Sequence, residues 1–291
     1  MEYILHIIIT LNIYVTLVLA ANLPVGLANL LSICQAAFYG IGAYFSAYIL
    51  MHWNLPFIVV AGVVMILTGL SSLIVSFASI RLKGDYFVLA SLAFQMIVFT
   101  ILYNWINITR GPYGISGIPG IKLFGKVSMS GIFDYFVLTT IVSSIVILLF
   151  DHLKKSPFGR ILTAIRSDEL EVSSLGRNPA EHKNYAFFIS AAFSGLAGLL
   201  YASYISYIDP TSFTLDESIF ILTALFIGGI GNIKGPVFGA LFVVILPEIL
   251  RFVGLPEMIA ANLRQIIYGL VLVIIMYYRP QGIMGELKIG N

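Results

Sequence analysis

The chain has 291 residues, of which 59% are hydrophobic and 10% are charged, and its mean hydropathy is +0.98. Soluble domains average about 25% charged residues, so this composition is that of an integral membrane protein. The net charge of +2 is too small to indicate nucleic acid as the partner. The single cysteine, Cys34, has no partner for a disulfide or a Cys/His cluster, so we expect no metal site.

Apolar segments follow one another along the whole chain, and residues 3–80 contain no Asp, Glu, Lys or Arg. Because a helix needs about 20 residues to cross a bilayer, we expect about nine spans (8–10). They lie at 4–22, 25–50, 57–80, 86–104, 132–150, 185–207, 218–231, 235–250 and 264–278. Their continuous apolar character excludes a transmembrane β-barrel. The expected fold is one all-α polytopic transmembrane helical bundle over residues 1–291, with interrupted helices.

Two of these segments are not plain spans. The sequence GGIGNIKGP at 228–236 divides one apolar stretch, and Gly, Pro, Asn and Gln residues interrupt another between positions 22 and 42. Broken helices inside a membrane are tolerated where they pack in protein or line a cavity, and in transporters they indicate the translocation site. The candidate pathway residues are Asn29, Gln35, Gly40, Gly42, Gln95, Gly229 and Gly231.

The amide side chains among these candidates have a second interpretation. Asn29, Gln35 and Gln95 either line a pathway for a polar solute or hydrogen-bond neighbouring helices, and the bonding role is the commoner one. Within 185–207, small residues recur at i,i+4, which predicts close packing of helices. These pairs are Ala191/Gly195 and Ser194/Gly198.

The segment 151–184 holds 11 of the chain's 30 charged residues and is the one sizeable element expected outside the bilayer. Its basic residues place it in the cytoplasm by the positive-inside rule. Counting spans then puts the C-terminus inside and the N-terminus outside, with Arg81, Lys83, Arg279 and Lys288 inside. The basic residues of the external loop 105–131 argue mildly the other way. Within 151–184, Ser167 or Asp168 is expected to cap a short helix that ends at Gly176.

Motifs of catalysis are missing from the sequence. It contains no HExxH, no GxSxG and no intramembrane Asp pair, and the glycines at 228–231 lack the spacing of a phosphate loop. We therefore expect a transport subunit that is not an enzyme. An intramembrane enzyme acting on lipid, with Asp168 and Glu169 as acid and base, is a weaker alternative because no nucleophile accompanies them.

Ionisable residues lie near the ends of the expected spans, as Asp85, Glu248 and Arg264 do, and no buried carboxylate is expected among the spans. Ion-coupled carriers often use such buried groups. A stand-alone secondary carrier is therefore a second alternative, and energy supplied by another protein is favoured. The charged segment 151–184 is the expected docking place for that protein.

Several segments together resemble the membrane permease of branched-chain amino acid ABC importers, in the right order and over most of the chain. They are QAAFYGIGAY (35–44), RLKGDYF (81–87), TRGPYGISGIP (109–119), the run 156–210, GGIGNIKGPVFGA (228–240) and RPQGI (279–283). Two positions depart from the family pattern. The stretch from Glu171 to Gly176 keeps only the acid and the glycine of the usual docking loop, and Arg110 stands where a small residue is expected.

The resemblance implies a permease in the cell inner membrane that passes leucine, isoleucine or valine by alternating access. The implied partners are a second permease chain in a heterodimer, two cytoplasmic ATPase subunits that carry ATP and Mg, and an extracytoplasmic solute-binding protein. No cofactor is implied for this chain itself. The implied ATPase-coupling residues, within 165–178, are Asp168, Glu169, Glu171, Gly176 and Arg177. Permeases for urea or short amides look similar and remain an alternative.

Overall fold

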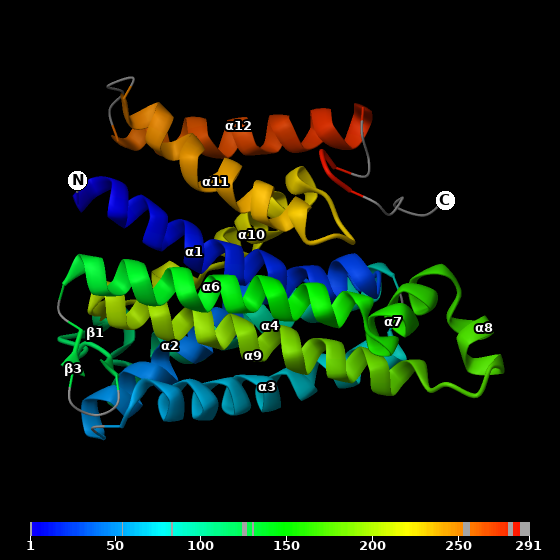
Figure 1. Ribbon diagram of the computed structural model, residues 1–291, viewed down its shortest axis with the longest axis horizontal. Coiled ribbons are helices and arrows are strands. Elements are labelled where there is room, and N and C mark those ends of the chain that lie inside the picture. The colour runs from blue at the N-terminus through cyan, green and yellow to red at the C-terminus, as the bar shows by residue number, and fades with distance from the viewer. Residues whose placement is uncertain are drawn as a thin grey trace.

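The computed structural model describes residues 2–53, 55–82, 84–123, 127–129, 131–252, 257–278 and 282–285. Long helices run side by side along one direction and form a bundle (Figure 1). The long helices are α1 (Glu2–Asn22), α2 (Gln35–His52), α3 (Phe57–Arg81), α4 (Asp85–Asn104), α6 (Ile132–Lys155), α9 (Pro179–Ile205), α10 (Leu215–Gly228), α11 (Lys234–Phe252) and α12 (Glu257–Tyr278). The all-α expectation is confirmed.

Shorter elements connect the long helices. They are η1 (Leu23–Leu27), α5 (Ile106–Thr109), η2 (Gly111–Tyr113), α7 (Pro157–Ser167), α8 (Glu169–Ser174) and η3 (Pro210–Phe213). Within the described residues, four strands of two residues each form two antiparallel pairs, β1 (Ile115–Ser116) with β4 (Tyr207–Ile208) and β2 (Lys122–Leu123) with β3 (Val127–Ser128). The first pair ties the loop after α4 to the end of α9.

Five of the described helical segments are long and apolar enough to cross a membrane on their own. They are Glu2–Leu27, Phe57–Ala78, Asp85–Asn104, Ile132–Lys155 and Pro179–Ile205. The other four expected spans correspond to α2, α10, α11 and α12. Of these, α10 has only 14 residues, about 21 Å of helix, which is shorter than the hydrocarbon core of a bilayer. The multi-pass membrane fold is thus built from full-length helices together with shorter ones beside the two interruptions.

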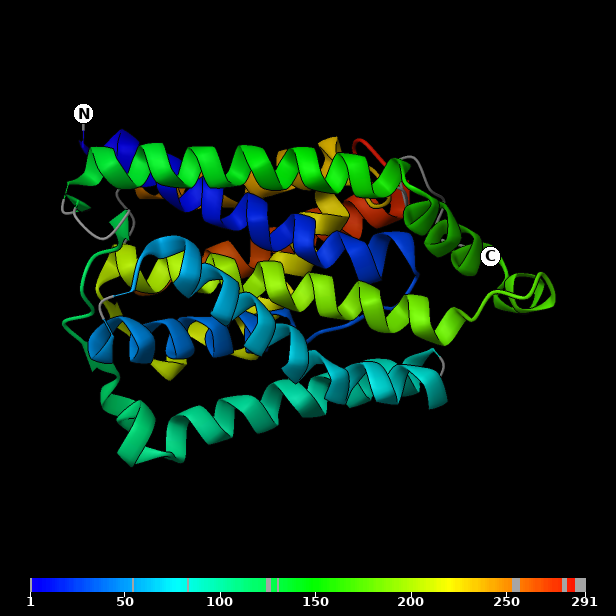
Figure 2. The same cartoon turned by 60° about the horizontal axis from the view of Figure 1, so that its bottom comes forward.

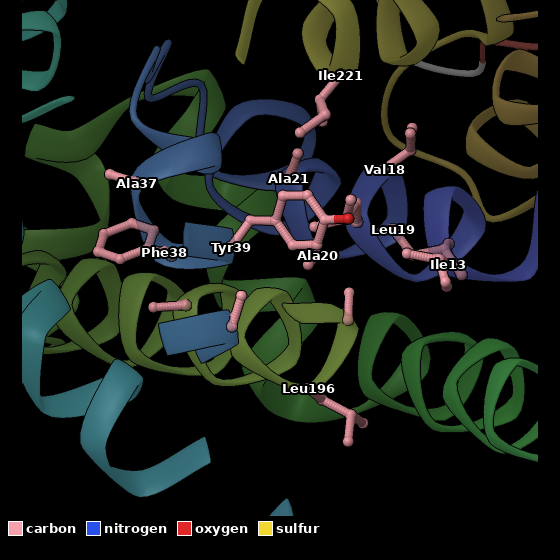
Figure 3. Close-up of a cluster of buried hydrophobic side chains, with 14 of the residues drawn as sticks. Ile13, Val18, Leu19, Ala20, Ala21, Ala37, Phe38, Tyr39, Leu196 and Ile221 are labelled. Carbon is pink, nitrogen blue, oxygen red and sulfur yellow. The ribbon is translucent and has the colours of Figure 1, made fainter. Parts of the chain in front are cut away.

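The core lies where α1, α2, α9 and α10 meet. Figure 3 shows Tyr39 of α2 among Ala20, Leu19 and other side chains of α1, with Leu196 of α9 nearby. Small residues bring α2 and α9 together: a Cβ on Gly42 would lie 2.3 Å from Cα of Gly195. The small-residue spacing in α9 therefore marks a close helix contact, as predicted.

The polar loop lies at one end of this bundle. α7 and α8 extend beyond the ends of α6 and α9, and α1 begins at the opposite end, in both views (Figures 1 and 2). The expected orientation also used Lys83, Arg279 and Lys288, which lie outside the described residues.

Candidate functional site

The projecting loop consists of two short helices with side-chain caps. Ser156 Oγ accepts a hydrogen bond from Gly159 N at 3.3 Å at the start of α7. Asp168 Oδ1 accepts from Leu170 N at 2.7 Å and from Glu171 N at 3.3 Å at the start of α8. The predicted cap at Asp168 is confirmed.

An ion pair holds α8 against the N-terminal end of α9. Lys183 Nζ lies 2.8 Å from Glu169 Oε1, and the Lys183 residue is only 5% exposed. Val172 of α8 is also buried. Gly176 follows with a φ of +75°, a conformation that favours glycine, and the chain turns there towards α9. Of the five predicted coupling residues, Glu169 faces the bundle, whereas Glu171, Gly176 and Arg177 are exposed.

Apolar side chains project from α8 and from Leu175, the residue that follows it. Leu170 is 73% exposed and Leu175 is 82% exposed, although α8 lies beyond the ends of the long helices (Figure 1). Large apolar side chains that gather on a polar loop are typical of a protein-binding surface. We name Leu170, Glu171, Leu175 and Arg177 the tip surface.

Helix α7 connects this loop to the first interruption of the membrane helices. Its buried side, with Leu162 and Ile165, packs on the bundle. From its last turn, Arg166 Nη1 donates a hydrogen bond to the carbonyl oxygen of Gly26 in η1. Burial lowers the pKa of the Arg166 guanidinium from its ordinary value, which indicates that water is partly removed from this contact.

The first interruption separates η1 from α2, so the span expected at 25–50 is two elements. Residues 28–34 are not helical, and Asn29, which is exposed, has a φ of 54°. Backbone amides in this segment have partners: Leu30 N donates to Pro24 O and Ile33 N to Ser91 Oγ, each at 2.9 Å. Such pairing is what a non-helical segment inside a membrane requires.

Side chains from other helices accept hydrogen bonds from backbone amides at the start of α2. Ala37 N donates to Gln95 Oε1 at 2.7 Å, and Gln95 Nε2 donates to Phe213 O at 2.9 Å. Ala36 N donates to Ser218 Oγ at 2.9 Å. The Gln95 side chain is fully buried, so in this structure it bonds neighbouring elements.

The other predicted pathway residues near α2 also contact neighbouring helices. Gln35 Nε2 donates to Ser190 Oγ at 3.2 Å and to Ser194 Oγ. A Cβ on Gly40 would lie 2.9 Å from the ring of Phe213. The arrangement favours packing and bonding for this group, and its pathway role stays a prediction.

The second interruption lies between α10 and α11, where Gly229 and Gly231 have φ values of 111° and 84°. Asn22, the last residue of α1, connects it to the first interruption. Asn22 Oδ1 accepts from Gly231 N at 3.1 Å, and Asn22 Nδ2 donates to Asn232 O at 2.7 Å. The structure thus brings the two predicted interruptions together, through a residue that the sequence did not single out as a site.

One carboxylate lies deeper than predicted. Helix α10 begins at Leu215, three residues before the expected span, and Glu217 in its first turn accepts a hydrogen bond from Tyr14 Oη at 2.6 Å. Tyr14 lies 12 residues after the start of α1, about 18 Å along it. Glu217 is thus a half-buried carboxylate at a helix end that lies deeper in the bundle than expected, because α10 is short and begins beside Tyr14.

Apolar helices that break within the bundle, together with a projecting polar loop, define a polytopic membrane protein. Comparison with known proteins adds the family. The chain belongs to the branched-chain amino acid transport system / permease component family, which matches residues 3–276.

Individual relatives of the chain are also named as permeases. The chain is 33% identical to the high-affinity branched-chain amino acid transport system permease protein LivM of Escherichia coli, over 96% of this chain and 70% of the relative. It is 33% identical to the probable branched-chain amino acid transport permease protein LivM of Methanocaldococcus jannaschii, over 72% of this chain and 62% of the relative. A shorter match, 31% identical over 35% of this chain and 33% of the relative, is to the ribose import permease protein RbsC of Haemophilus influenzae. No solved structure matches the chain at a significant level.

Proposed function

We propose that this chain is a permease subunit of an ATP-driven ABC importer that moves branched-chain amino acids across the cytoplasmic membrane by alternating access. The names of its relatives support leucine, isoleucine and valine as the solutes. The observation that carries the energy coupling is the hydrogen bond from Arg166 to Gly26, because it joins the projecting loop to the interrupted membrane helices.

The proposed importer contains a second permease chain in a heterodimer, two cytoplasmic ATPase subunits that bind ATP and Mg, and an extracytoplasmic solute-binding protein. The ATPase subunits dock on the tip surface, where Leu170 and Leu175 supply exposed apolar area. In this arrangement the loop 151–184 and the C-terminus face the cytoplasm. This chain contributes the path for the solute and no ATP hydrolysis.

Movement passes from the ATPase to the membrane helices through packed elements. When the ATPase subunits close on ATP, they displace α8, and the ion pair between Glu169 and Lys183 transmits that displacement to α9. Helix α7 moves with α8, and Arg166 then displaces η1, which is continuous with Asn22 and both interruptions. Small shifts at one site can switch packed helices between two arrangements.

The test is reconstitution of the complex that copurifies with the tagged chain from its native membrane. Mass spectrometry is expected to identify a second permease and P-loop ATPases, and proteoliposomes are expected to take up radiolabelled leucine only with ATP and the binding protein. Isoleucine and valine should compete. Uptake of urea or acetamide in place of leucine would establish the short-amide alternative, and leucine uptake by this chain alone, driven by an ion gradient, would overturn the proposal in favour of a secondary carrier.

A further inference from the structure

A cavity of about 500 Å³ opens between α1, η3, α10 and α12. Sites for small molecules have volumes of about 300 to 1,000 Å³, so the cavity is large enough for an amino acid. Its lining contains none of the predicted pathway residues. Its lining includes Tyr14, Thr214, Glu217, Phe220, Tyr268 and Leu272.

Two carboxyl groups line the cavity. Glu217 is partly buried in its wall, and Asp216 lines it nearer the solvent. Among the described residues, no Lys or Arg forms an ion pair with Glu217, and its partner is the Tyr14 hydroxyl. An unpaired carboxylate within a membrane is costly and usually marks a functional site. A cationic group in the cavity would offset that cost.

Aromatic rings form the neighbouring wall. The ring of Phe220 lies 5.4 Å from that of Tyr14 and 5.1 Å from that of Tyr268, centroid to centroid. The Tyr268 hydroxyl donates to Val243 O, so Tyr268 presents its ring to the cavity. Aromatic faces attract ammonium groups and also pack against aliphatic chains. The wall therefore suits a molecule that has both an ammonium group and an apolar side chain.

We infer that this cavity holds a branched-chain amino acid in transit, with its ammonium group paired to Glu217. Its aliphatic side chain lies against Phe220 and Leu272, and the Thr214 hydroxyl at the start of α10 donates to its carboxylate. This inference rests on the proposed function, which names the solute but not where the solute is held. Glu217 is then a binding residue for the ammonium group.

Cysteine modification in the reconstituted complex tests the site directly. Cys34 is buried and is the chain's one cysteine, so Cys34→Ala leaves this chain without a thiol, and modification is read on this chain by mass spectrometry. Thr211→Cys then places a reporter at an exposed position of the cavity lining. We expect L-leucine to slow the reaction of this thiol with a methanethiosulfonate reagent, and isocaproate, which lacks the ammonium group, to leave the rate unchanged.

Substitution of the carboxylate gives the decisive comparison. Glu217→Gln should raise the L-leucine concentration needed for protection by about tenfold or more, and Glu217→Asp should restore part of the protection. Glu2→Gln, an exposed carboxylate at the start of α1, is the matched control and should change nothing. Equal protection by L-leucine and isocaproate, or unchanged protection in Glu217→Gln, would overturn the inference.

A second measurement does not require the Glu217 variants to assemble. With Glu217 intact, the cationic aminoethyl methanethiosulfonate should modify Thr211→Cys faster than the anionic sulfonatoethyl reagent, and equal rates would contradict a cation-selective cavity. Leucine uptake by wild-type vesicles from the same preparation separates the two proposals. Absence of that uptake refutes the proposed function, whereas normal uptake without any dependence on Glu217 refutes only the site.

Discussion

Arg166, in the last turn of α7, donates a hydrogen bond to the carbonyl oxygen of Gly26, 140 positions earlier in the chain. Gly26 lies against the second interruption as well, because a Cβ built on it would be 3.0 Å from Gly231 N and would overlap the Asn22 side chain. The projecting loop, η1 and both interruptions thus form one connected structure. If the loop moves, η1 and the interruptions move with it as long as the hydrogen bond between Arg166 and Gly26 holds.

Arg166→Gln should uncouple ATP hydrolysis from transport. Hydrogen bonds to charged groups contribute about 1.5–3 kcal/mol, so loss of this one is expected to lower leucine uptake roughly tenfold or more. The ATPase subunits should still copurify, because the tip surface is unchanged. The ratio of leucine transported to ATP hydrolysed in proteoliposomes measures the effect.

Arg160→Gln is the matched control, since Arg160 lies on the exposed side of the same helix. Its ratio should equal that of the wild type. Equal ratios in the Arg166 and Arg160 variants would show that the contact with Gly26 does not carry the coupling.

Glu169→Gln should lower the stability of the chain, whereas Glu171→Gln should not. Glu169 holds the buried Lys183, so its neutralisation leaves a buried cation without its carboxylate. Glu169 is about one-third exposed, which reduces the loss to on the order of 2 kcal/mol of unfolding free energy. A lower midpoint of thermal unfolding is expected for Glu169→Gln, and an unchanged one for Glu171→Gln.

A double variant checks that the pair is responsible. Lys183→Met, which removes the buried charge, should recover part of the stability lost in Glu169→Gln. If the double variant is less stable than Glu169→Gln alone, the ion pair is not what positions α8.

Leu175→Asp should weaken binding of the ATPase subunits while the permease stays folded. Leu175 is 82% exposed, so the change removes apolar area from the tip surface without creating a cavity in the bundle. Copurification of the ATPase subunits, measured by quantitative mass spectrometry, is expected to fall. Tyr113→Asp, an 84% exposed position at the other end of the bundle, is the control and should leave copurification unchanged. Equal recovery of the ATPase subunits with both variants would place their docking surface elsewhere.

Much of the fold was predictable because membrane helices are apolar over a length that the bilayer dictates. The span expected at 57–80 corresponds to α3, and the one at 86–104 to α4, with ends that differ by one residue. The span at 185–207 begins earlier, at Pro179, because Asn178 caps it and Lys183 is neutralised by Glu169. From the sequence alone, a buried lysine cannot be told from a surface lysine when the carboxylate that pairs with it belongs to another helix.

The site was less predictable because its important pairs are distant in the chain. Glycines and amides marked the two interruptions, yet no local pattern could show that Asn22 joins them or that Arg166 reaches Gly26. Glu217 was placed just outside a span, since hydropathy counts apolar residues and does not reveal that α10 begins at the level of Tyr14. Depth in the membrane is set by packing of the short helices, which a single sequence does not show.

Gly42→Ala should destabilise the bundle, although alanine favours helices more than glycine does. The new methyl group would lie 2.3 Å from Cα of Gly195, so α2 and α9 must separate. Overpacking of this kind costs about 1–3 kcal/mol, more than the roughly 1 kcal/mol that alanine contributes in a helix interior. Gly62→Ala in α3 is the control, because nothing lies within 4 Å of the added Cβ, and it should be neutral or stabilising. Thermal unfolding in the same detergent compares them, and since helices in lipid associate through close packing, equal midpoints would mean that the α2–α9 contact does not hold the core together.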